Sequence, residues 1–95
     1  MAKIKVRLFG VFRMDTHLSN EDIEVEKVID IFDTLNILAG ERFAEKKKEN
    51  PLLAEPAPIA FKDAIVYING ERCSKKKRKL ENGDEIWLLS PASGG

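Results

Sequence analysis

The first residues of the chain alternate between apolar and charged side chains, which predicts a strand with one buried face. A period of two is typical of a half-buried strand. The apolar members of residues 3–8 are Ile4, Val6 and Leu8, and the charged members are Lys3, Lys5 and Arg7. We expect a bulge or bend at Gly10. Residues 15–20 are polar and turn-like, and a second strand over residues 23–26 is expected to complete a hairpin.

The apolar spacing then changes to three and four residues, which predicts one amphipathic helix. Its apolar residues are Val28, Ile31, Phe32, Leu35, Leu38 and Ala39. Asp30 is a candidate N-cap, and a start near Lys27 fits the spacing as well. Gly40 is expected to weaken or end the helix, which leaves residues 41–49 as a frayed continuation. Asn50-Pro51 is a stop signal, and three prolines within residues 51–58 predict a connecting loop.

The second half of the chain predicts three strands joined by tight turns. Residues 64–68 are strongly strand-like, and Asn69-Gly70 is the favoured type I′ turn before a short return strand over residues 71–73. Asn82-Gly83-Asp84 predicts another turn, and residues 85–89 predict the final strand. If the first and last strands lie side by side, they are parallel and the helix is their crossover.

These elements together predict an α+β fold of the β-grasp, or ubiquitin-like, type. We expect a mixed sheet of four to five strands with one main helix packed across one face. The predicted domain covers residues 1–89, and residues 90–95 form a flexible tail.

Composition excludes several classes of function. Sixteen Lys and Arg residues balance sixteen Asp and Glu residues in 95, so no net field favours nucleic acid or an anionic membrane. Cys73 is the single cysteine, which rules out an internal disulfide and fits a reducing cytoplasm. The alternating start resembles neither a signal peptide nor a membrane span. We therefore expect a cytoplasmic protein. We also expect no bound cofactor or metal, because neither His17 nor Cys73 has a second candidate ligand near it in the sequence.

The candidate chemistry lies at the end of the sequence, where Gly94 and Gly95 follow a proline-containing segment. Because glycine lacks Cβ, such a tail can lie extended in a channel too narrow for other residues. Pro91 stiffens the exit from the last strand by fixing φ. The terminal carboxylate is then suited to delivery into the active site of another protein. A fraying chain end is the alternative interpretation.

Two surface features have candidate roles in binding. If Ile86 and Leu88 face the helix, Trp87 and Leu89 face the other side of the sheet, where Phe9 is expected to join them. We call Phe9, Trp87 and Leu89 the apolar patch, which is typical of a partner surface unless long loops cover it. The second feature is a cationic run in a hairpin connection, made of Lys75, Lys76, Lys77, Arg78 and Lys79. We interpret this run as a solvated loop, with docking to an acidic surface as a hypothesis.

Three segments carry a resemblance to a known family: residues 4–13 (IKVRLFGVFR), residues 65–71 (IVYINGE) and residues 80–95 (LENGDEIWLLSPASGG). They resemble the MoaD/ThiS family of ubiquitin-like sulfur carriers, in particular its MoaD branch. The last segment is similar to the family ending of L-x-(D/N)-G-D-E-V, a hydrophobic strand, a proline-containing turn and Gly-Gly. Residues 40–58 are longer and more charged than is usual in the family, and the tail has one proline where a pair is common.

The resemblance implies that a ubiquitin-activating-type (MoeB/ThiF-like) enzyme uses ATP to adenylate the carboxylate of Gly95, which a sulfur donor converts to a thiocarboxylate. Gly94 would be its steric companion. The tail would enter a MoaE-like large subunit of molybdopterin synthase and deliver sulfur to the pterin precursor in molybdenum or tungsten cofactor biosynthesis. The chain would be a sulfur-carrying subunit and not an enzyme by itself. Expected partner contacts are Phe9, Trp87, Leu89, Pro91 and Ser93.

Two alternatives stay open from the sequence. A sulfur carrier for thiamin or tRNA thiolation, or a ubiquitin-like protein modifier, would share the tail chemistry. A ubiquitin-like interaction domain without thiocarboxylate chemistry would use the sheet face, and its Gly-Gly would be incidental.

Overall fold

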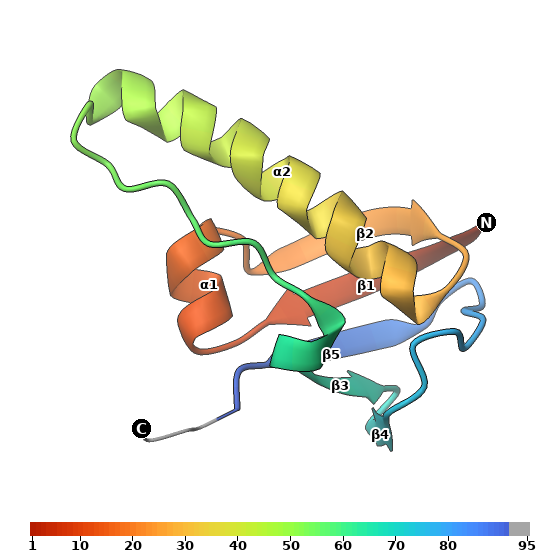
Figure 1. The fold of residues 1–95 in the computed structure, drawn as a ribbon. Helices are drawn as coiled ribbons and strands as arrows, with labels where there is room; N and C mark the ends of the chain where they lie inside the picture. The colour runs from red at the N-terminus through yellow and green to blue at the C-terminus, as the bar shows by residue number, and fades with distance from the viewer. Residues whose placement is uncertain (92–95) are drawn as a thin grey trace.

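A computed structural model describes residues 1–91 and arranges them as a five-stranded sheet with a long helix across one face (Figure 1). The strand order is β2-β1-β5-β3-β4, in which β1 and β5 are parallel and the other neighbours are antiparallel. This mixed sheet, with α2 between its two hairpins, is the β-grasp fold that the sequence predicts. The elements are β1 (Ala2–Leu8), α1 (Val11–Thr16), β2 (Asn20–Val25), α2 (Val28–Glu49), the 3-10 helix η1 (Phe61–Asp63), β3 (Ile65–Ile68), β4 (Glu71–Cys73) and β5 (Glu85–Leu89).

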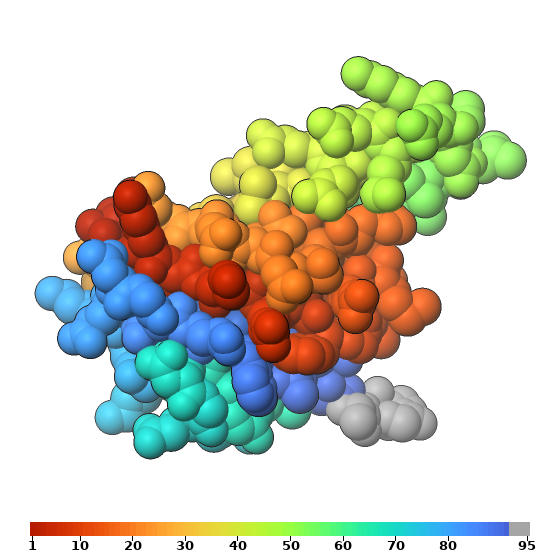
Figure 2. Space-filling view, turned by 180° about the vertical axis from the view of Figure 1, so that it is seen from behind, coloured from red at the N-terminus to blue at the C-terminus, as the bar shows by residue number. Residues whose placement is uncertain are grey.

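The hydrophobic core lies between the sheet and α2. The even-numbered side chains of β1 and β5 are buried and the odd-numbered ones are exposed or half-buried, as a period of two requires. On α2, Val28, Ile31 and Leu35 are fully buried. Burying one such side chain stabilises the fold by about 1.5–3 kcal/mol. This face of the sheet is therefore covered by α2 and is not available to a partner. The opposite face is open in the view from behind (Figure 2), where β1 and β5 lie at the surface.

A short helix, α1, follows β1 where the sequence predicts a bend and a polar turn. Gly10 turns the chain with φ 61 and ψ −134, a conformation that is accessible mainly to glycine. The hydroxyl of Thr16, which is buried, donates to the carbonyl of Phe12 at 2.6 Å and accepts from the backbone N–H of Leu18 at 3.1 Å. The prediction of a turn from residue 15 and a strand from residue 23 is therefore wrong in its boundaries, because α1 extends to Thr16 and β2 begins at Asn20.

The helix α2 begins after Lys27, and Asp30 stands one turn inside it. The carboxylate of Asp30 accepts a hydrogen bond of 3.0 Å from the backbone N–H of Lys27, which satisfies one donor at the helix start. Of the two candidate starts, the one near Lys27 is confirmed. The predicted helix end at Gly40 is wrong, since α2 continues without a break to Glu49. Asn50 then ends the helix, as the Asn-Pro pair predicts.

Tertiary contacts explain why α2 continues past Gly40. The side-chain amide of Asn36 exchanges two hydrogen bonds with the backbone of Ile59, of 2.9 and 2.8 Å, and these hold the 51–58 loop along the helix (Figure 1). Arg42 donates to the carbonyl of His17 at 3.1 Å and lies 3.9 Å from the carboxylate of Glu21. Together, the contacts of Asn36 and of Arg42 outweigh the cost of one glycine, which is about 1 kcal/mol in a helix interior.

The tight turns form as the sequence predicts. Asn69 and Gly70 have positive φ values of 51 and 88, as a type I′ turn requires. Gly83, with φ 89, occupies the turn before β5. Cys73 is buried, and its thiol donates a weak hydrogen bond to the carbonyl of Lys75 at 3.6 Å. Among residues 1–91 there is no helix with the length and apolar character needed to cross a membrane.

Candidate partner-binding face and tail root

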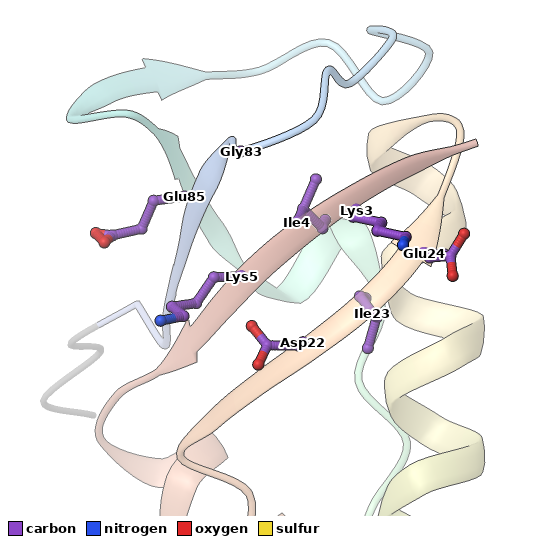
Figure 3. Close-up of a pocket in the computed structure, with 8 residues that line it drawn as sticks. All are labelled: Lys3, Ile4, Lys5, Asp22, Ile23, Glu24, Gly83 and Glu85. Atoms are coloured by element: carbon purple, nitrogen blue, oxygen red, sulfur yellow. The ribbon is translucent and has the colours of Figure 1, made fainter.

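The sheet face that α2 leaves open is divided into a charged half and an apolar half. The charged half surrounds a shallow depression of about 680 Å³ over β1 and β2 (Figure 3). The strand register places Lys3 opposite Glu24, and it places Lys5 between Asp22 and Glu85. Opposite charges across neighbouring strands each contribute roughly 0.2–1 kcal/mol. Pairing of opposite charges between neighbouring strands therefore explains why this half of the face carries charged side chains.

The apolar half is centred on Trp87 in β5. The ring of Phe9 meets the ring of Trp87 edge to face at 5.9 Å between centroids, and the ring of Tyr67 lies 6.5 Å away on the other side. The indole N–H of Trp87 donates to Glu85 at 3.1 Å, so its one polar group is satisfied within the chain. Phe9 is 37% exposed, which leaves apolar ring surface available to another protein.

The structure brings the three members of the apolar patch to the same face, as their odd positions predict. Leu89 and Trp87 are half-buried and alternate with the buried Ile86 and Leu88. The alternative, that long loops cover the patch, does not fit the path of the 51–58 loop, which packs against α2 on the far side of the sheet. That the patch binds a partner stays a prediction.

The tail root, which we define as Ser90 and Pro91, lies against the junction of β1 and α1. The backbone N–H of Phe9 donates to the carbonyl of Leu88 at 3.0 Å, which extends the pairing of β1 with β5 beyond the strand end. At Gly10 a Cβ atom would stand 3.1 Å from the hydroxyl oxygen of Ser90. Glycine at this position therefore makes room for the root of the tail.

Of the predicted tail residues, Pro91 is described by the structure and is exposed. Ser93, Gly94 and Gly95 lie outside the described residues, so their roles stay predictions.

Sequence reasoning missed three residues of this region. Tyr67 and Ile65 are half-buried neighbours of Trp87 and Leu89 across the β3–β5 register. The alternation with the buried Val66 and Ile68 could have placed them on the open face. Gly10 was read as a bend, but its contact with Ser90 joins positions 80 residues apart and has no local signal.

Within residues 1–91, no three His, Cys, Asp or Glu side chains are grouped so that they could hold a metal ion. Neither His17 nor Cys73 lies on the apolar half of the open face.

The sheet order and the single crossing helix define the class: this is a ubiquitin-like β-grasp protein. Small archaeal modifier protein 1 (SAMP1) from Methanosarcina acetivorans is similar over 100% of this chain and 98% of its own, with a TM-score of 0.69 and 29% identity. Subunit 1 of a molybdopterin converting factor from Pyrococcus furiosus is similar over 96% and 99% of the two chains, with a TM-score of 0.65 and 24% identity.

A third solved structure is a complex of subunits 1 and 2 of molybdopterin-converting factor from Helicobacter pylori. It aligns with 98% of this chain and 99% of that chain, with a TM-score of 0.55 and 20% identity. No family model matches the chain, and no curated protein matches its sequence. The structural neighbours thus include small subunits of molybdopterin converting factors and ubiquitin-like archaeal modifiers.

Proposed function

We propose that the chain is a sulfur carrier protein that serves as the small subunit of molybdopterin synthase. The observation that carries the proposal is the position of the apolar patch, which lies beside the root of a tail ending in Gly94-Gly95. Phe9 contributes both its ring to the patch and its backbone N–H to the strand end before Ser90. A partner bound over the patch would therefore receive the tail directly. Full-length likeness to subunit 1 of molybdopterin converting factors supports this reading.

The proposed chemistry takes place on the carboxylate of Gly95. A free carboxylate is a poor electrophile, so an adenylating enzyme first directs one of its oxygens to the α-phosphorus of ATP and pyrophosphate leaves. A sulfur nucleophile then attacks the acyl carbon and displaces AMP. The nucleophile is hydrosulfide, or a persulfide whose S–S bond a thiol then reduces. Gly94 and Gly95 keep the reacting end slim enough to enter two successive active sites. The chain contributes the carrier, and its partners contribute the catalytic groups.

A second candidate is a ubiquitin-like protein modifier, which the 29% identity to SAMP1 favours. It would use the same adenylated Gly95, but a lysine amine of a target protein would displace AMP and form an isopeptide bond. A third, a ubiquitin-like interaction domain, would use the apolar patch alone. Sulfur supply for thiamin or tRNA thiolation shares the carrier chemistry and differs only in the acceptor.

Intact-protein mass spectrometry tests the carrier chemistry. The full chain is incubated with a MoeB/ThiF-like adenylating enzyme, ATP and a sulfur source, and a chain lacking Gly95 is the control. We expect a mass gain equal to the replacement of one oxygen by sulfur in the full chain and no change in the control. Release of AMP with no gain in mass, together with residues 80–95 found attached through Gly95 to lysines of other proteins after trypsin digestion, would instead establish the modifier.

Binding to a MoaE-like large subunit then separates molybdopterin synthesis from the other sulfur pathways. We expect the sulfur-loaded chain to form a stable complex with that subunit and to convert the pterin precursor. A loaded chain that does not bind the subunit would contradict the molybdopterin assignment and retain the sulfur-carrier assignment.

A further inference from the structure

The cationic run of residues 75–79 is exposed along its whole length and extends the charge of Arg72 on β4. Within residues 1–91, the one ion pair closer than 4.0 Å joins Arg42 to Glu21, so no member of the run is neutralised by a contact in the described part of the chain. The five exposed cations of the run and the exposed Arg72 on β4 form a local positive surface on a protein whose total charge is zero.

The backbone of the run is held in place by α2. The carbonyl of Lys76 accepts a hydrogen bond of 2.8 Å from Ile29, and the carbonyl of Arg78 accepts one of 3.0 Å from Val28. Leu80 donates to Glu26 at 2.9 Å and closes the connection. These bonds satisfy the first N–H groups of the helix, so the run is an ordered part of the fold and not a loose loop. The sequence interpretation of a solvated loop holds for its side chains only.

The position of these cations is unfavourable for the fold. The N-terminus of a helix carries a partial positive charge, so anions stabilise it and cations destabilise it. Here the chain places its densest group of cations against the N-terminus of a helix of 22 residues. Neutral side chains would supply the same backbone carbonyls at no electrostatic cost. The charge of the run is therefore better explained by a ligand than by stability.

We propose that the cationic run and Arg72 form a preorganised docking site for an acidic protein surface. Arg72, Lys75 and Arg78, with Cys73 and Ser74, line a depression of about 450 Å³, which is wide enough to accept carboxylate side chains. A guanidinium group binds a carboxylate through two parallel hydrogen bonds, so the two arginines give such a site directional contacts. The fixed backbone lowers the ordering cost of binding.

The surrounding charges favour a protein over nucleic acid or a membrane. Glu71 and Glu81 stand on either side of the run, and Glu26 and Asp30 lie beside it at the start of α2. These carboxylates repel an extended polyanion but are compatible with a protein surface whose charges are patterned in reverse. The run also contains no aromatic side chain on which a base could stack.

The cationic run lies near the start of β5, at the end of this strand opposite the tail root. Arg72 pairs with Tyr67, which pairs with Trp87, so the docking site extends from there to the edge of the apolar half. The run precedes the first residue of β5, whereas Ser90 and Pro91 follow its last residue, and Figure 1 shows the two at opposite ends of the strand. Five strand residues separate them by roughly 15 Å at about 3.3 Å per residue. An acidic partner can thus be bound at the run without reaching the tail root, and at Arg72 it would come beside the apolar patch. This proposal goes beyond the proposed sulfur chemistry and does not depend on it.

A binding experiment on the full chain tests the proposal. The probes are a short Glu-rich peptide interrupted by Lys and an oligothymidylate of the same net charge, each titrated against the isotope-labelled protein by NMR. We expect the peptide to shift the amides of residues 72–79 and to bind more tightly than the oligothymidylate. The variant K75E/K76E/R78E reverses three charges. It is expected to lower the affinity for the peptide roughly tenfold, at about 0.5 kcal/mol for each exposed ion pair that is lost.

The far end of α2 provides a matched control. Lys46, Lys47 and Lys48 are also exposed and consecutive, so the variant K46E/K47E/K48E makes the same change in net charge away from the site. It should leave peptide affinity nearly unchanged. Equal losses in both variants, absence of any shift at residues 72–79, or tighter binding of oligothymidylate would each overturn the proposal.

Stability provides a readout that does not depend on the probe. If the cations serve a ligand and not the fold, K75Q/K76Q/K77Q should raise the urea midpoint of unfolding. By contrast K46Q/K47Q/K48Q should lower it, because those cations stand at the C-terminus of α2, where they are favourable. A lower midpoint in the first variant would show that the run stabilises the fold, and the proposal would fail.

Discussion

The side-chain amide of Asn69 donates a hydrogen bond of 2.9 Å to the carboxylate of Asp84, and so joins the turn after β3 to the turn before β5. The side-chain oxygen of Asn69 also accepts a hydrogen bond of 2.9 Å from the backbone N–H of Glu85. The carboxylate of Asp84 accepts one of 2.9 Å from the backbone N–H of Glu81. Two of the segments that carry the family resemblance are thus locked together in space. Their polar residues fix the start of β5, the strand that leads to the tail.

Replacing Asp84 by asparagine is expected to destabilise the domain by about 1 kcal/mol, since one of the two partly buried donors to its carboxylate, from Asn69 and Glu81, loses its acceptor. Asp84 is 9% exposed, so water replaces the missing partner poorly. Urea unfolding followed by tryptophan fluorescence measures the change. The control is Asp15→Asn, which alters the same chemical group on an exposed position of α1. A loss no larger than that of the control would show that the second acceptor oxygen of Asp84 contributes nothing to stability.

Much of the fold could be predicted because its signals are local. Alternation of apolar and charged residues identified β1, and the Asn69-Gly70 pair identified a turn in which both residues have positive φ. The helix α1 was missed because it is six residues long and is closed by the hydroxyl of Thr16, a contact that composition does not reveal. The length of α2 was underestimated because contacts of Asn36 and Arg42 with distant segments outweigh the local weakness of Gly40.

The candidate site was predictable to the extent that it depends on strand parity. Trp87 and Leu89 were placed on the open face because their neighbours are buried, and the same argument extends to Tyr67. The contact of Gly10 with Ser90, and the hydrogen bonds that tie the cationic run to α2, join residues far apart in the chain. No pattern within one segment encodes such pairs, so they become visible only in the folded structure.

Gly10 provides a second test, because it holds the tail root through its lack of a side chain. We expect Gly10→Ala to cost about 1–3 kcal/mol of stability, since a non-glycine residue at φ 61 and ψ −134 is strained. The new Cβ would also press on the hydroxyl of Ser90. NMR shifts of the Phe9 and Ser90 amides, with urea unfolding, measure both effects.

Adding Ser90→Gly to that variant separates the two causes. The double variant should recover the amide shifts while keeping most of the loss in stability, because the backbone strain at position 10 remains. Unchanged shifts in the single variant would contradict the assigned contact between Gly10 and the tail root.

Gly40 is the counterpart of Gly10, since it is exposed in the middle of α2 with no atom within 4 Å of where a Cβ would stand. Gly40→Ala is expected to stabilise the protein by about 0.5–1 kcal/mol, because alanine has the higher helix propensity and restricts the unfolded chain. The rise in thermal midpoint is the measurement. A fall would mean that the glycine has a contact or a motion that this conformation of α2 does not show.

The apolar patch is tested by truncating its aromatic members. Trp87→Ala and Phe9→Ala should each weaken binding to a MoaE-like large subunit, with a loss for Trp87 of about 2 kcal/mol or more, roughly thirtyfold in Kd. Isothermal titration calorimetry measures the affinities. The matched control is Ile37→Ala, which removes an apolar side chain that is 64% exposed on α2, away from the open face.

The contact between Phe9 and Trp87 also predicts how the losses in binding affinity of the two alanine variants combine. Because the rings pack edge to face at 5.9 Å, removing one should disturb the position of the other, so the double variant should lose less affinity than the sum of the single losses. Circular dichroism confirms that each variant is folded. If Ile37→Ala weakened binding as much as Trp87→Ala did, the partner would be docking on the helix side. The tail would then have to reach it from the far face of the sheet, which the position of the tail root beside Phe9 makes geometrically unfavourable.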